Sequence, residues 1–230
     1  MHPFYIGLLL NSLIFFPTIA GIARFRKINK AYHPLIYLAW FTTITIITNT
    51  ILSYTIRNNT VSFNIHALVE GFLLLWIFKE WKLFNKKELL LKWLISIYII
   101  FWIIYFIGFG LINTFYSHFE IFRHFVLVFL TIHFLNKMIS NPGQSLLKDA
   151  RFYTCLGFMI YFFLNCTTAA FWIFNLEIGT VYTIPLSIIV NATHALYYLI
   201  LGFSILILPK KQKFLLSQQR YYSSGISKTA

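Results

Sequence analysis

Seven apolar runs, each long enough to cross a bilayer as a helix, dominate this sequence. A hydrocarbon core about 30 Å thick requires roughly 20 helical residues. Composition agrees, because 59% of the 230 residues are hydrophobic and only 11% are charged, whereas about a quarter are charged in a soluble domain. The sequence therefore predicts an all-α polytopic membrane protein, a bundle of seven transmembrane helices over residues 1–208 with a basic tail over 209–230. The seven predicted spans are approximately 4–23, 35–56, 63–81, 90–111, 119–135, 153–174 and 182–208.

Basic residues are confined almost entirely to alternate breaks between these runs. If the N-terminus is outside, the inner loops and the tail carry 17 of the 19 Lys and Arg residues, and the outer loops carry Arg57 alone. Cytoplasmic loops are enriched in Lys and Arg, so we expect the N-terminus outside and the C-terminus in the cytoplasm. The net charge of +13 then indicates contact with anionic lipids on the cytoplasmic side rather than with nucleic acid. We expect an integral protein of the plasma (inner) membrane of a prokaryote.

Ionisable side chains inside the runs are the candidates for a functional site, because a charge in hydrocarbon is costly. The third, fifth and seventh runs carry such residues at spacings of three and four, which places each set on one helix face. At about 1.5 Å per residue, most of these positions fall in the outer half of the membrane, and Asn191 and His194 lie deepest. The pattern predicts a polar pocket that is open to the outside and closed below. The candidate ligand-binding residues are His66, Glu70, Arg123, His124, Asn191 and His194.

Helix packing is the alternative explanation for these residues. Glu70 and Arg123 are expected to form an ion pair, which would by itself fix the third helix against the fifth. Glu120 lies only one residue inside the fifth run, close to the headgroups, and we expect it to contribute little to a site. As a ligand site, Arg123 suits an anion such as a carboxylate, and histidines can respond to pH between about 5 and 8.

We expect no cofactor, although some of these residue types bind metal ions. A metal site, if there is one, would use His66, Glu70, His124 and His194, but no paired HxxxH or HExxH motif occurs. A retinal Schiff base is excluded because the seventh run has no lysine. An enzyme is the less favoured interpretation, since Ser187 is the only serine near the histidines and no Gly-x-Ser-x-Gly motif accompanies it.

Seven helices with an external N-terminus resemble the topology of rhodopsins and seven-helix receptors. The resemblance includes no sequence motif. The favoured hypothesis is a receptor-like sensor or accessory protein with an outward-facing polar pocket. Because the sequence contains no output domain, the signal would pass to a separate partner protein through the basic inner loops and tail. The alternatives are a small transporter or channel, for which a homo-oligomer is compatible, and an intramembrane metalloenzyme.

Overall fold

The computed structural model describes residues 3–84, 87–109, 117–140, 146–173 and 180–209, and these residues are helical apart from short connections. Seven stretches are long and apolar enough to cross a membrane, which confirms an all-α fold with seven candidate spans and indicates an integral membrane protein. Two short 3₁₀ turns, Lys30–Tyr32 and Leu146–Lys148, precede α3 and α7. The predicted tail lies outside the described residues except for Pro209. The helices are α1 (Pro3–Ser12), α2 (Phe15–Arg24), α3 (His33–Thr55), α4 (Thr60–Glu80), α5 (Glu88–Phe109), α6 (Ser117–Ile139), α7 (Ala150–Ile173) and α8 (Thr180–Ile207).

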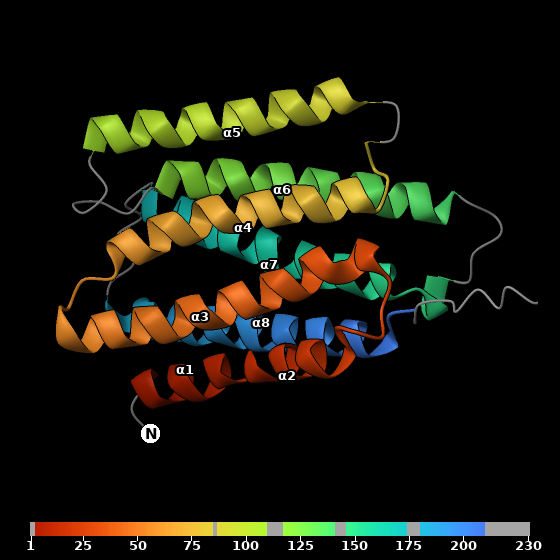
Figure 1. The fold of residues 1–230 in the computed structure, drawn as a ribbon. Helices are drawn as coiled ribbons and strands as arrows, with labels where there is room; N and C mark the ends of the chain where they lie inside the picture. The colour runs from red at the N-terminus through yellow and green to blue at the C-terminus, as the bar shows by residue number, and fades with distance from the viewer. Residues whose placement is uncertain (1–2, 85–86, 110–116, 141–145, 174–179, 210–230) are drawn as a thin grey trace, which may run out of the picture.

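The spans lie roughly side by side along one direction and alternate in sense (Figure 1). In the view of Figure 1, α5 forms one edge and α1 with α2 the other. Helix α8 contacts α1, α2 and α7, while α4 contacts α3, α5 and α6. The main hydrophobic core lies among α2, α3, α4, α6, α7 and α8, and Leu91 of α5 joins it.

The first predicted span, 4–23, is divided into α1 and α2 rather than being one continuous helix. Pro17 has no N–H to donate to the Leu13 carbonyl four residues earlier. The Phe16 N–H donates to that carbonyl instead at 3.0 Å, and the Leu13 N–H donates to Leu10 O at 3.3 Å. Beyond the break, the Phe16 ring packs directly over Gly202 of α8, where any Cβ would overlap with it.

Helix α5 is attached to α4 and α6 through aromatic side chains on one of its faces. The buried Tyr98 hydroxyl donates to the carbonyl of Ala67 on α4, and Trp102 Nε1 donates to the Asn64 carbonyl at 3.2 Å. Tyr98 fits only because residue 71 is glycine, since a Cβ at Gly71 would overlap the tyrosine hydroxyl. The other faces of α5 expose large apolar side chains, as expected for a helix in contact with lipid.

Basic residues of the described chain gather at the end of the bundle where α2, α4, α6 and α8 end. Two of them bind backbone there: Arg24 Nη2 donates to Leu208 O at 2.6 Å, and Lys137 Nζ donates to Lys82 O at 2.7 Å. Arg57 lies at the opposite end, between α3 and α4. The orientation of the basic end in the membrane stays a prediction. The basic residues at this end are Arg24, Arg26, Lys27, Lys30, Lys79, Lys82, Lys87, Lys92, Lys137, Lys148 and Arg151.

Candidate functional site

Arg123 lies at the centre of a buried polar network between α4 and α6. It forms ion pairs with Glu70 of α4 and with Glu120, one turn earlier on α6, and its Nε also donates to Glu120 Oε2 at 3.1 Å. The three side chains belong to residues that are only 2–6% exposed. The predicted pairing of Glu70 with Arg123 is thus confirmed. Two carboxylates share one guanidinium, so the three ionised groups carry one negative charge in excess.

Glu120 was expected to lie near the headgroups and to contribute little, and the second part of that expectation is wrong. Although it belongs to the first turn of α6, it is buried and paired with Arg123, and its Oε2 also lies 3.4 Å from His124 Nε2. The sequence did contain a signal for this position, because Glu120 precedes Arg123 by three residues and His124 by four, which is the spacing of neighbours on a helix surface. His118, by contrast, is exposed.

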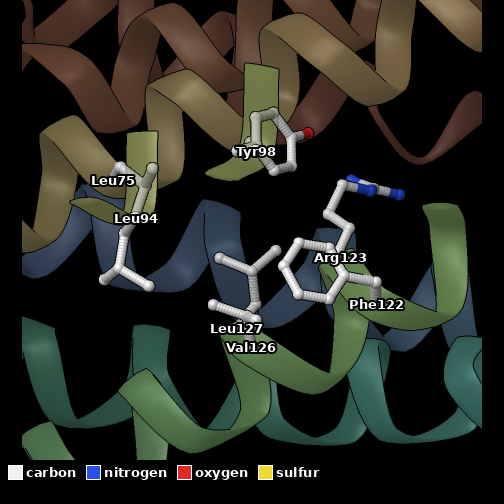
Figure 2. Close-up of a pocket in the computed structure, with 8 residues that line it drawn as sticks. Leu75, Leu94, Tyr98, Phe122, Arg123, Val126 and Leu127 are labelled. Atoms are coloured by element: carbon white, nitrogen blue, oxygen red, sulfur yellow. The ribbon is translucent and has the colours of Figure 1, made fainter. Parts of the chain in front are cut away.

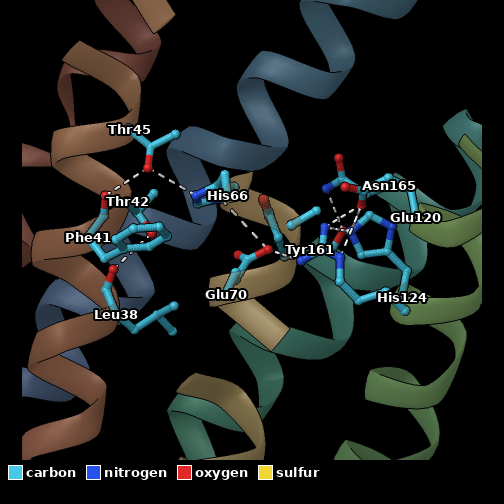
Figure 3. A network of polar contacts seen from close by, with 12 residues as sticks. Leu38, Phe41, Thr42, Thr45, His66, Glu70, Glu120, His124, Tyr161 and Asn165 are labelled. Atoms are coloured by element: carbon cyan, nitrogen blue, oxygen red, sulfur yellow. Dashed lines mark hydrogen bonds and ion pairs between the residues drawn. The ribbon is translucent and has the colours of Figure 1, made fainter. Parts of the chain in front are cut away.

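His66 extends the network from α4 to α3 (Figure 3). Its Nδ1 lies 3.2 Å from Thr45 Oγ1, and its Nε2 lies 3.8 Å from Glu70 Oε2. The ring is stacked on Phe41, with centroids 5.4 Å apart and an interplanar angle of 9°. Its side chain is 13% exposed, which makes it more accessible than Glu70.

His124 lies on the other side of the network, against α7. Its Nε2 is 2.8 Å from Arg123 Nη2, and its ring lies 5.6 Å from that of Phe162 on α7. The other ring nitrogen, Nδ1, is buried and has no hydrogen-bond partner in the part of the chain that the structure describes.

His194 of α8 borders the network through α7. Its Nε2 lies 3.3 Å from Asn165 Oδ1, and its ring lies 5.1 Å from that of Tyr161. Asn165 Nδ2 in turn donates to the Tyr161 carbonyl at 2.7 Å. Asn165 and Tyr161 lie next to His124 in Figure 3. These two α7 residues were not among the predicted ligand-binding residues, because sequence spacing does not reveal which faces of two different helices meet.

Asn191 is the predicted site residue that contacts another part of the bundle. It accepts a hydrogen bond from Asn11 Nδ2 of α1 at 3.0 Å and donates to the Ser187 carbonyl at 2.8 Å. Its contacts therefore tie α1 to α8, whereas His66, Glu70, Arg123, His124 and His194 are gathered in or beside the network.

The outward-open pocket expected from the sequence stays a prediction. A small cavity of about 20 Å³ lies between α4, α5 and α6, beside Arg123, Tyr98 and Gly71 (Figure 2). This volume accommodates about one water molecule. Within the described ranges, no three His, Cys, Asp or Glu side chains are arranged to hold a metal ion.

Comparison with known proteins gives no relative: no family model, no curated protein and no solved structure matches this chain. The chemistry of the site therefore has to be read from its own geometry. The guanidinium that was expected to receive an anion is already paired with two carboxylates. An excess negative charge in a buried site is compensated most directly by a proton or a small cation. The arrangement thus suits proton or cation binding better than anion binding.

Proposed function

We propose that this protein is a seven-helix membrane sensor or accessory protein, in which the network around Arg123 responds to protons or small cations. A separate partner protein receives the signal. The observation that carries this proposal is the buried set of two carboxylates and one guanidinium, bordered by three histidines. If the buried charges balanced one another, a role in helix packing would explain them fully. The excess carboxylate needs a further positive charge, and that charge is the variable part of the site.

The network joins α3, α4 and α6, so a change in its charge would alter how these helices pack. His66 connects α4 to Thr45 of α3, and Arg123 connects α4 to α6. Loss of one proton would leave an uncompensated charge among these helices, and local electrostatic changes of this kind bias packed elements between two arrangements. We therefore propose that occupancy of the network is read out as a shift in the packing of α3, α4 and α6.

The partner is proposed to bind at the basic end of the bundle. Enrichment of Lys and Arg at one end favours its placement in the cytoplasm, with the N-terminus outside. In this orientation the exposed side of His66 belongs to the outer half of the membrane, and the basic end is free for anionic lipids and for an acidic surface on a partner protein. We propose the plasma membrane of a prokaryote as the location.

A thermal-shift experiment on the purified full chain tests this proposal. We expect the melting temperature to fall between about pH 5.5 and about pH 8, where histidines titrate, because loss of the compensating proton leaves an unpaired buried charge. Glu120→Gln removes the excess charge and should flatten this dependence, whereas His133→Gln, at an exposed histidine on the same helix, should not. Small anions should give no shift.

The proposal fails if the pH dependence is the same in the wild type and in Glu120→Gln. It also fails if neither pH nor any cation changes the melting temperature. In both cases the network would be only a packing device, and a scaffold for a partner protein would be the better account.

A further inference from the structure

The three histidines of the site have different hydrogen-bond partners, and these partners assign a different protonation form to each ring. We infer that His66 is the proton-binding site of the network and holds the compensating proton on Nε2, between its ring and Glu70. This inference rests on the proposed function, since it names the proton as the species that the network binds and His66 as the residue that binds it.

Thr45 fixes which atom of His66 carries the first proton. The Thr45 hydroxyl donates its single hydrogen to the Phe41 carbonyl at 3.0 Å. Its oxygen can then only accept from a further neighbour. The His66 Nδ1, 3.2 Å away, must therefore be the donor, so Nδ1 is protonated.

The other nitrogen of the His66 ring faces a carboxylate. In a neutral ring with a proton on Nδ1, Nε2 would present a lone pair to Glu70 Oε2 at 3.8 Å, and the two would repel. A second proton on Nε2 converts this contact into an attraction between opposite charges. The stacked face of Phe41 favours a cationic ring further.

For the other two histidines, the described hydrogen bonds call for no second proton. A guanidinium only donates, so His124 Nε2 must accept from Arg123 Nη2 at 2.8 Å and cannot carry a proton. Asn165 uses its Nδ2 to donate to the Tyr161 carbonyl, so its Oδ1 accepts from His194 Nε2. One proton satisfies that contact.

Charge balance leads to the same residue. The described charged and titratable groups that face His66 are Glu70 on its own helix, Arg123 and His124 from α6, and His194 from α8. Glu120 belongs to the same network through Arg123. Helix α3 presents the uncharged Thr45 and Phe41. With His66 and Arg123 positive and both carboxylates negative, the network is neutral. The His66 side chain is also the more exposed of the pair, at 13% against 2% for Glu70.

Nitrogen NMR of the full chain in lipid bilayers, with labelled histidines, tests this inference directly. The His66 signals are identified by their loss in His66→Gln. At about pH 7 we expect both ring nitrogens of His66 to be protonated. In Glu120→Gln the remaining pair is balanced without His66, so its titration midpoint should fall by at least about one pH unit. Thr45→Val, which removes the acceptor for Nδ1, should lower the midpoint as well, whereas Glu80→Gln, at the far end of α4, should leave it unchanged.

A neutral His66 ring at about pH 6, or a midpoint that Glu120→Gln does not move, overturns the inference. This failure can be distinguished from failure of the proposed function. If His66 is neutral while the melting temperature still depends on pH and on Glu120, the network binds its proton elsewhere and the sensor proposal stands. Because a proton held only in the folded state makes stability depend on pH, the sensor proposal needs a separate readout. If His66 is charged but the NMR signals of α3, α4 and α6 away from the network do not shift as it titrates, the proton site stands and the sensor proposal fails.

Discussion

Arg123→Gln is the most direct test of the network, because Arg123 is the side chain that contacts both Glu70 and Glu120. The substitution keeps a polar side chain of similar reach but removes the positive charge. Both carboxylates are then left buried without their partner. Removing one partner of a buried ion pair costs about 3–5 kcal/mol, and we expect a value near the upper end because two carboxylates lose the same partner.

Glu70→Gln should cost less than Arg123→Gln, and the structure gives the reason. In that variant Arg123 still binds Glu120 through its ion pair and through Nε at 3.1 Å, so no charge is stranded. The loss is then nearer to that of one charged hydrogen bond, about 1.5–3 kcal/mol. Because the two side chains are in contact, the double variant should depart from additivity by about 0.5–3 kcal/mol.

Equilibrium unfolding in mixed micelles of a mild and a denaturing detergent measures these free energies. Arg57→Gln is the matched control, since Arg57 is exposed and lies in the connection between α3 and α4. It should change stability by no more than about 0.5 kcal/mol. The reasoning would be refuted if Arg123→Gln resembled this control, if Glu70→Gln were the more destabilising of the two, or if the two losses were strictly additive.

Two further predictions concern the fold. Gly71→Ala should destabilise the protein by about 1–3 kcal/mol in the same unfolding assay, because the new Cβ overlaps the Tyr98 hydroxyl. The control Gly108→Ala should be nearly neutral, because a Cβ there meets nothing within 4 Å. Equal effects of the two substitutions would mean that α5 does not pack through Tyr98. In a cysteine-free background on intact cells, a cysteine at Arg57 should react with an impermeant thiol reagent and one at Lys148 should not, and the opposite labelling would reverse the predicted orientation.

The seven spans could be predicted from sequence because the bilayer fixes helix length directly. Helix boundaries were less predictable. The fifth run was predicted to end at residue 135, but α6 continues to Ile139. A helix does not have to end where the hydrocarbon ends. Lys137 lies in this last part of α6, and its long side chain reaches the backbone carbonyl of Lys82. The break at Pro17 was also missed. A proline inside an apolar run was visible in the sequence, but whether the chain bends or breaks there depends on what packs against it.

The pairing of Glu70 with Arg123 could be predicted because opposite charges in hydrocarbon have few other partners. The hydrogen-bond partners of the histidines were a different matter. Thr45 and Asn165 lie on helices whose rotation about their own axes is set by packing, and spacing within one helix does not determine that rotation. Asn191 illustrates the limit, since it shares a polar stripe with His194 but contacts α1, whereas His194 contacts α7.

The packing between the network and the basic end is our reason for proposing a sensor rather than a transporter. Helices α4 and α6 continue toward that end with side chains that are at most 2% exposed, among them Leu74, Phe78, Leu127 and Phe134. The Phe78 ring lies 6.1 Å from that of Phe134, within the range of direct aromatic packing. A transported ion would have to pass through this close-packed apolar layer. A proton that binds at the network does not have to cross the layer and only has to change how the surrounding helices pack. In the proposed mechanism, a change in the network repacks this apolar layer, which lies between the network and the end where we propose that a partner binds.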